Sequence, residues 1–213
     1  MLFDQPSYEN RVFSSDFIEP PDPEPGRLPE LSGVTFTLCA FKDMSFEHVR
    51  AVRGCTFEKC AFIGTPFNET LFERCAFNVC IVKRGDFLRT VFKDCRCMGI
   101  EVLGARCTGM RVEGGDWSYA NLANLKFARQ TLHGVRLREA SLAGCQFKEC
   151  DLTGCDLTRA TVRGARFEAC DLREARLDGV AVSEAVWTGS KIDLLQCVAI
   201  AQQVTGAVYE ETA

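Results

Sequence analysis

The feature that most constrains this chain is an apolar residue at every fifth position. Stepping by five through Phe147, all 29 positions from residue 52 to residue 192 are apolar: ten Phe, eight Leu, six Val, two Trp, two Cys and one Ile. With 46% hydrophobic residues overall, chance would give such a run with a probability on the order of 10⁻¹⁰. The chain is therefore built from five-residue repeats, and we call the apolar position of each repeat its centre, i.

The period of five excludes a regular helix and a straight strand. In a helix, five residues advance a side chain by about 140°, so the centres would cover every face. In a straight strand, successive centres would alternate between core and solvent. Both problems disappear if the chain turns a corner once per repeat. Glycine suits such corners, and 12 of the 17 glycines stand at i+2.

We therefore expect a solenoid whose narrow interior is lined by the centres and by their neighbours at i−2. The i−2 residues are mostly Cys or Ala, and a small side chain beside a large one fits a narrow bore at normal packing density. The predicted core residues are Phe57, Phe62, Phe67, Phe72, Phe77, Phe87, Phe92, Trp117, Phe127, Phe147, Leu152, Leu157, Phe167 and Leu172.

Several repeats resemble the signature A-(D/N)-L-x-x of the pentapeptide-repeat family. The clearest are CDLTG at 150–154, CDLTR at 155–159, CDLRE at 170–174 and ANLAN at 120–124, and the resemblance covers about three quarters of the chain. It implies an all-β fold, a right-handed quadrilateral β-helix with four pentapeptides per coil. Residues 20 apart would then stack at the strand spacing of about 4.7–4.9 Å.

The sequence divides into an N-terminal segment (1–33), the repeats (34–192) and a C-terminal segment (193–213). Phe3, Tyr8, Phe13 and Ile18 are spaced by five, which indicates either a degenerate first coil or a loosely ordered terminus with chance spacing. Residues 19–30 hold five of the seven prolines and four acidic residues. Because proline donates no backbone hydrogen bond, we expect this stretch to form a projecting loop outside the ladder.

Two irregularities interrupt the repeats. Phe36, Phe41 and Phe46 are one residue out of frame with the later centres, which predicts one extra residue within 49–53, as a bulge or a widened corner. Between 97 and 130 we expect large and small side chains to exchange places, and a buried Gln130 would need a hydrogen-bond partner. There the i−2 residues Ile100, Met110, Leu125 and Gln130 are large or polar, and the centres Cys97 and Cys107 are small.

After residue 192 the pattern changes to that of a helix with Asp193 as N-cap and Gly206 at its C-terminal end. It is apolar on two faces. We expect one face, formed by Leu194, Val198 and Ala201, to cap the solenoid. The second face would form a two-fold dimer, although a helix that only caps a monomer is the alternative. The predicted dimer residues are Cys197, Ile200, Val204, Val208 and Tyr209.

The ending GSKIDLLQCVAIAQQVTGAVYE resembles the quinolone-resistance (Qnr-like) and self-immunity branch of the family, and YENRVFSSDF resembles its opening more weakly. This resemblance implies binding to a type II topoisomerase, DNA gyrase or topoisomerase IV. Members of the branch protect the enzyme from poisons, and the family account is that an acidic rod imitates DNA.

The charge distribution argues against simple DNA mimicry. The net charge is −4 for the whole chain, but it is +4 for residues 52–192, −5 for 1–51 and −3 for 193–213. A surface that competes with DNA should be predominantly negative, and one that binds DNA should be predominantly basic. We therefore expect target contact through the loop and no direct nucleic-acid binding, with a generic interaction scaffold as the alternative function. The candidate loop residues are Glu19, Pro20, Asp22, Glu24, Arg27 and Glu30.

Other residues favour a binding protein over an enzyme. The two histidines, His48 and His133, have no evident acid or nucleophile partner, so we expect no catalytic site, cofactor or metal. The 13 cysteines mostly occupy i−2, which favours buried reduced thiols over disulfides or a zinc site. Without a membrane-length apolar run or a signal-peptide pattern, we expect a cytoplasmic protein.

Overall fold

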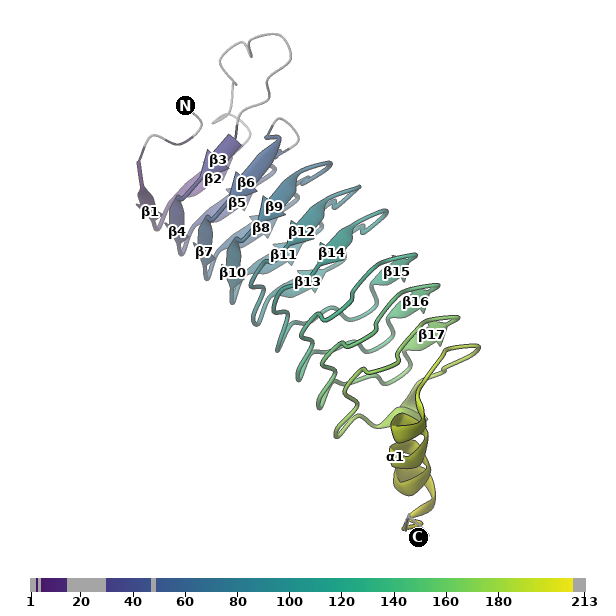
Figure 1. The fold of residues 1–213 in the computed structure, drawn as a ribbon. Helices are drawn as coiled ribbons and strands as arrows, with labels where there is room; N and C mark the ends of the chain where they lie inside the picture. The colour runs from purple at the N-terminus through teal and green to yellow at the C-terminus, as the bar shows by residue number, and fades with distance from the viewer. Residues whose placement is uncertain (1–2, 4, 15–29, 47–48, 209–213) are drawn as a thin grey trace.

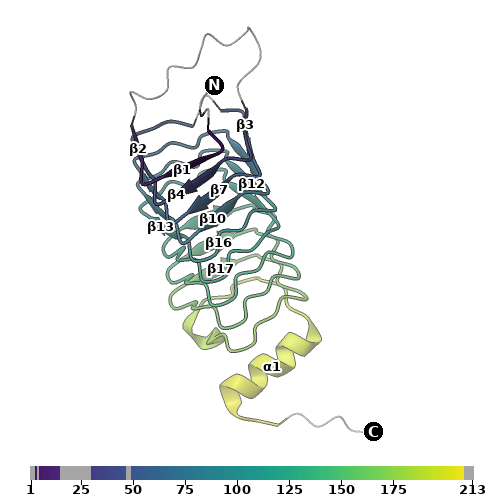
Figure 2. The same cartoon turned by 90° about the vertical axis from the view of Figure 1, so that its left-hand side faces the viewer.

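The computed structural model describes residues 3, 5–14, 30–46 and 49–208. The chain winds into a rod of stacked coils, with β1 at one end and the single α-helix α1 (Leu194–Thr205) at the other (Figures 1 and 2). All strand pairs are parallel, and each strand has three residues, of which the middle one is buried in nearly every case. The predicted β-solenoid with a C-terminal helix is confirmed.

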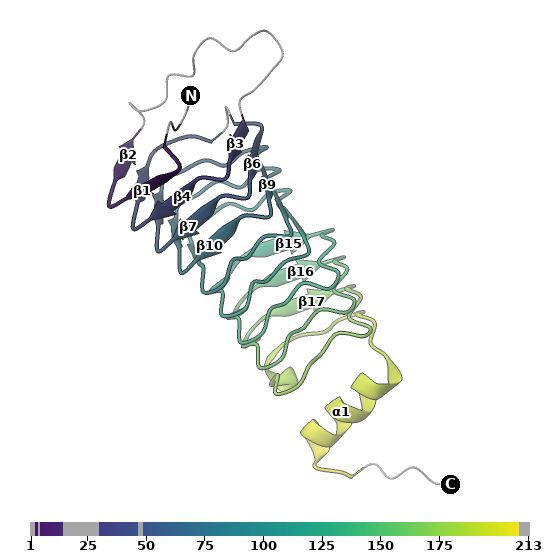
Figure 3. The same ribbon diagram turned by 60° about the vertical axis from the view of Figure 1, so that its left-hand side comes forward.

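The coils have four sides, which we number in the order in which the chain passes them. Side 1 holds β1 (Ser7–Glu9), β4 (Thr35–Thr37), β7 (Thr56–Glu58) and β10 (Ala76–Asn78). Side 2 holds β2 (Val12–Ser14), β5 (Ala40–Lys42), β8 (Ala61–Ile63), β11 (Ile81–Lys83) and β13 (Glu101–Leu103). Side 3 holds β15 (Lys126–Ala128), β16 (Gln146–Lys148) and β17 (Arg166–Glu168), which Figure 3 places away from the N-terminal sheets. Side 4 holds β3 (Glu30–Ser32), β6 (Ala51–Arg53), β9 (Leu71–Glu73), β12 (Val91–Lys93) and β14 (Arg111–Glu113).

The register confirms the predicted extra residue. Phe57 pairs with Phe77 at a step of 20 residues, but Phe36 pairs with Phe57 at a step of 21. On side 4, Leu31 pairs with Val52 at 21 and Val52 pairs with Phe72 at 20. The additional residue therefore lies between Phe46 and Val52, where Val49 and Ala51 are both buried.

The N-terminal residues form a first coil rather than a loose terminus. Tyr8 pairs with Phe36, Phe13 pairs with Phe41, and Phe3 is buried against them, whereas Ile18 lies outside the described residues. The tube thus begins before residue 34. Glu30 corrects the predicted loop boundary, because its backbone pairs with Ala51 as the first residue of β3.

All the predicted core residues are buried, and their rings stack from coil to coil. The centroids of Phe147 and Phe167 are 4.8 Å apart and their planes differ by 3°. The exchange of sizes is also confirmed: the small centre Cys97 is buried together with the large i−2 residues Ile100 and Met110. Gln130 is buried and donates Nε2 to the Ala128 carbonyl at 3.4 Å, while its Oε1 has no partner.

The i−2 side chains do more than fill space. Cys75 Sγ donates to the Val52 carbonyl at 3.2 Å, Cys155 Sγ to Leu132 at 2.8 Å, and Thr90 Oγ1 to Phe67 at 2.9 Å. Each acceptor is the centre 23 residues earlier, in the preceding coil. All 13 cysteines are unpaired thiols, and 11 of them are buried.

Candidate functional site

The predicted target-binding loop falls almost wholly outside the described residues. The role of the candidate residues that the structure does not describe stays a prediction; these are Glu19, Pro20, Asp22, Glu24 and Arg27. Glu30 lies on β3, with its Oε2 3.8 Å from Arg53 Nε on the neighbouring strand β6. The described residues on either side of this segment, Ser14 and Glu30, belong to β2 and β3 at the N-terminal end of the rod.

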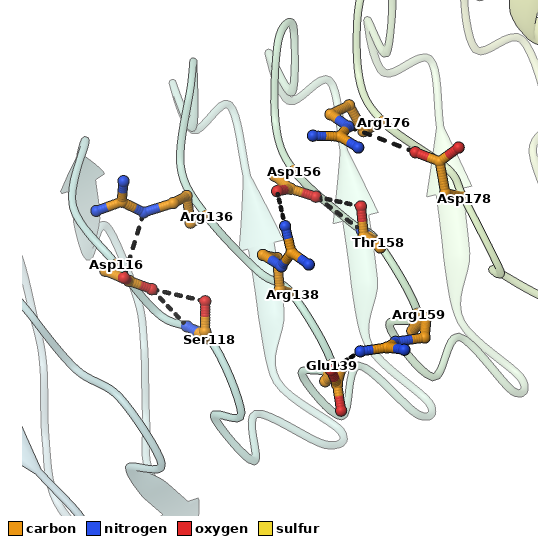
Figure 4. A network of polar contacts seen from close by, with 10 residues as sticks. All are labelled: Asp116, Ser118, Arg136, Arg138, Glu139, Asp156, Thr158, Arg159, Arg176 and Asp178. Carbon is orange, nitrogen blue, oxygen red and sulfur yellow. Dashed lines mark hydrogen bonds and ion pairs between the residues drawn. The ribbon is translucent and has the colours of Figure 1, made fainter.

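The lateral surface is a ladder of opposite charges. On side 1, residues 20 apart alternate in sign, and Asp116 Oδ2 lies 3.2 Å from Arg136 Nε in the next coil. Arg138 reaches Asp156 at 3.4 Å, and Arg159 bonds Glu139 (Figure 4). Exposed pairs of this kind add little stability, but they neutralise each other locally. Side 1 therefore carries no acidic stripe that could imitate DNA.

Asp156 is the most connected carboxylate of this ladder. Partial burial by itself would raise its pKa, but the Thr158 hydroxyl and backbone N–H both donate to Oδ1. Arg138 and Arg176 add favourable charge, and together these groups hold the pKa of Asp156 below its ordinary value. The carboxylate stays ionised near neutral pH, so the ladder is a fixed pattern of charge.

Helix α1 covers the C-terminal end through polar side chains. Asp193 Oδ1 accepts from the Gln196 N–H at 3.0 Å, and Gln196 Oε1 accepts from the Asp193 N–H at 2.8 Å, which makes a capping box. Gln196 Nε2 donates to the carbonyls of Leu172 and Ala175, and Gln203 Nε2 donates to Val180. In the body of the tube such carbonyls accept from the next coil, so the two glutamines supply donors where the coils end.

This arrangement corrects the predicted faces of the helix. Ile200, assigned to the outward face, packs against the core, whereas Leu194, assigned to the capping face, is 77% exposed. The reason is that the last coil has backbone carbonyl groups facing the helix, to which a glutamine side chain can donate hydrogen bonds and a leucine side chain cannot. Of the other predicted dimer residues, Cys197, Val204 and Val208 are exposed and Tyr209 lies outside the described residues.

Of the two histidines, the structure describes His133 alone. The His133 ring bonds the Thr153 hydroxyl at 2.8 Å on the exposed surface of side 4, and His48 is not described. Among residues 3, 5–14, 30–46 and 49–208, no three His, Cys, Asp or Glu side chains gather as metal ligands would. Within the same ranges no helix has the length and apolarity needed to cross a bilayer.

Sequence reasoning missed Gln196 and Gln203. They stand seven residues apart, on the same face of a helix that is otherwise rich in apolar residues. That spacing was a usable signal, because two polar residues on one face of an apolar helix indicate a polar surface facing them.

The resemblance to pentapeptide-repeat proteins is confirmed by a family model. The model for pentapeptide repeats matches eight copies over residues 120–159, 132–173 and 150–186. Curated protein sequences gave no match to this chain.

Solved structures resemble the whole rod. A trypsin-treated variant of QnrB1, described as a plasmid-mediated fluoroquinolone resistance protein, is 21% identical with a TM-score of 0.76. The alignment covers 95% of this chain and 97% of that one. HetL, a pentapeptide-repeat protein involved in heterocyst differentiation regulation in the cyanobacterium Nostoc sp. strain PCC 7120, is 15% identical with a TM-score of 0.61. There the alignment covers 87% of this chain and 84% of HetL. At these identities the similarity establishes the fold.

Proposed function

We propose that this pentapeptide-repeat protein binds a type II topoisomerase, DNA gyrase in the first place, and protects it from a topoisomerase poison. It acts by stoichiometric contact and not by catalysis. The observation that carries the proposal is the similarity to QnrB1 over nearly the full length of both chains. The resemblance of the C-terminal sequence to the Qnr-like branch supports it independently.

The test is a supercoiling assay with purified gyrase and a fluoroquinolone, with and without this protein. We expect increasing amounts of the protein to restore supercoiling as they approach the amount of enzyme. No rescue from the poison, together with no inhibition of gyrase in its absence, would reject the proposal. Repeating the assay with topoisomerase IV distinguishes the two possible targets.

The contact with the enzyme is proposed to run through the acidic Pro-rich segment. The charge ladder on side 1 leaves no continuous acidic surface there, so a local projection is the better candidate. Deleting residues 20–29 should weaken protection while leaving the melting temperature of the rod unchanged. A matched variant, Asp22→Asn with Glu24→Gln, keeps the length of the segment and removes two charges, so it distinguishes the effect of charge from the effect of length. Full protection by the deletion variant would reject the role of the loop.

HetL motivates a second candidate function. A protein with this fold and a TM-score of 0.61 is involved in the regulation of differentiation, so the same rod can serve as an interaction scaffold without a topoisomerase. Failure of the gyrase assay would favour this function.

A further inference from the structure

A polar groove runs along the corner between sides 4 and 1 and has no part in the proposed function. It has a volume of about 310 Å³. Arg74 and Asp94 stand on its side 4 flank, and Arg96, Asp116 and Arg136 lie along its side 1 flank. The lining residues come from five successive coils, so the groove follows the axis of the rod.

Two of the three arginines in this groove have no carboxylate partner. Asp116 lies between Arg96 and Arg136 in the side 1 column, and its Oδ2 binds Arg136 at 3.2 Å. Its Oδ1 accepts from the Ser118 N–H and hydroxyl, so these contacts hold the carboxylate toward Ser118 and Arg136. Among the described residues, no carboxylate lies within ion-pair distance of Arg74 or Arg96, which leaves two free guanidinium groups in one groove.

The floor of the groove is open because its residues are small. Ala76 and Gly115 stand at positions where other coils carry longer side chains. Gly115 has a φ of +96°, and a Cβ on it would collide with the Cys95 carbonyl oxygen, so the backbone at residue 115 admits only glycine. The cavity is thus enforced by the backbone geometry of the corner.

We propose that this corner groove binds an acidic side chain of a protein partner, with the guanidinium groups of Arg74 and Arg96 holding its carboxylate. Guanidinium groups bind carboxylates through paired, charge-assisted hydrogen bonds. With three arginines and two aspartates lining it, the groove has a net charge of about +1. That charge suits one carboxylate group.

The surroundings of the groove disfavour DNA as the occupant. Among the described residues, Glu58 on β7 and Glu113 on β14 border it without an ion-pair partner, whereas Glu73 on β9 is paired with Arg53 and Lys93. A phosphodiester chain needs several adjacent cations to replace its counterions, and these carboxylates would repel it. A short acidic segment places one charge in the groove and avoids them. The proposal does not depend on whether the partner is gyrase.

The probe for the test is a fluorescein-labelled hexaglutamate peptide, followed by fluorescence anisotropy with the full-length protein at low ionic strength. We expect saturable binding that weakens with added salt, and no binding of a hexaglutamine peptide. The double variant Arg74→Ala with Arg96→Ala should weaken hexaglutamate binding at least about tenfold, because it removes both charged donors. Ala76→Leu, which narrows the groove and keeps every charge, should also weaken it.

The matched control is Arg111→Ala, since Arg111 is an exposed arginine on β14 that does not line the groove. It should leave hexaglutamate binding unchanged, and the melting temperatures of all variants should confirm that each is folded. Equal weakening in the control, absence of binding to the unmodified protein, or tighter binding of a 20-base-pair duplex would each overturn the proposal. Because no topoisomerase is present, the outcome is independent of the gyrase assay.

Discussion

At the scale of single residues, the interior depends on one large side chain per repeat. Phe77 is buried, with its ring stacked on Phe57 at 4.8 Å. Phe77→Ala should lower the free energy of unfolding by about 3–5 kcal/mol, because it empties a layer that neighbouring rings cannot refill. Urea unfolding followed by circular dichroism measures the loss. Asn78→Ala, on the same strand but facing outward, is the control, and a loss below about 1 kcal/mol for Phe77→Ala would contradict its place in the core.

The i−2 cysteines should respond to substitution as hydrogen-bond donors. Cys75→Ala leaves the Val52 carbonyl without its side-chain donor and should cost about 0.5–1.5 kcal/mol. Cys75→Thr should cost less, because Thr65, Thr70 and Thr90 fill equivalent slots and donate in the same way. Thermal unfolding of both variants provides the comparison. A threonine variant less stable than the alanine variant would show that packing dominates at this position.

The sequence predicts which residues line the bore but not these hydrogen bonds. The period of five is a local pattern, so it identifies Phe57 or Cys75 from neighbours in the chain. The acceptor of Cys75 is the carbonyl of Val52, 23 residues earlier, and only the stacking of coils brings the two together. Gln130 was recognised as an outlier for the same local reason, but the pattern did not show that its Oε1 would be buried without a partner.

At the scale of elements, α1 should depend on Gln196 more than on its apolar residues. Gln196→Leu removes the donor to the Leu172 and Ala175 carbonyls and buries an apolar group beside them. The cost should be about 1–3 kcal/mol, expressed as faster hydrogen exchange in α1 and the last coil. Gln202→Leu is the matched control, because the Gln202 side chain is exposed. Equal exchange in the two variants would contradict the capping role.

The attachment of α1 should also weaken in acid. The pKa of Asp193 is lowered below 3.8 by hydrogen bonds from the backbone N–H groups of Gln196 and Glu174. A lowered folded-state pKa means that its stabilisation is full at neutral pH and is lost as pH falls through that value. Protection factors of the α1 amides, which correct each measured exchange rate for the intrinsic rate at the same pH, should fall between pH 6 and about 3. Asp193→Asn keeps a capping oxygen without titrating, so it should flatten this dependence.

The ends of α1 follow from sequence, but its orientation does not. Asp193 and Gly206 mark the boundaries because capping preferences act within one turn. The face turned to the tube was misassigned because hydrophobicity favoured Leu194, whereas the open carbonyls of the last coil select Gln196 and Gln203. Which carbonyl groups lack a partner at the end of the tube can be determined only once the three-dimensional position of the last coil is known.

At the scale of the whole molecule, α1 is the best candidate for self-association. Leu194, Leu195, Val204 and Val208 are 61–81% exposed in the absence of a partner, and such a patch at the end of a rod suits a two-fold dimer. Sedimentation at micromolar concentration should give a dimer, which Val204→Asp should convert to a monomer. Ile200 is not a suitable test, since it packs on the core. A monomeric unmodified protein would contradict the dimer.

At this scale the repeats from Val52 to Ile192 were predictable because each one has the same pattern, whereas the first coil was left open against a loosely ordered terminus. For the Pro-rich stretch 19–30 the sequence supports a proposed role, through its charge, but gives no repeat from which a backbone path could be predicted. The corner groove was equally hidden, because Arg74, Arg96 and Gly115 belong to three successive coils. Their proximity depends on the 20-residue register.

That register also relates the length of the rod directly to the number of its coils. Within the stretch from Val52 to Ile192, residues 20 apart stack in adjacent coils, as Phe127, Phe147 and Phe167 do. Removing one whole coil should preserve every side and every column while shortening the span by about 4.7–4.9 Å. Insertion or deletion of 20-residue coils can therefore change the distance between the proline-rich segment and the terminal helix in fixed steps. An insertion of any other length has to be accommodated locally, as the extra residue between Phe46 and Val52 is.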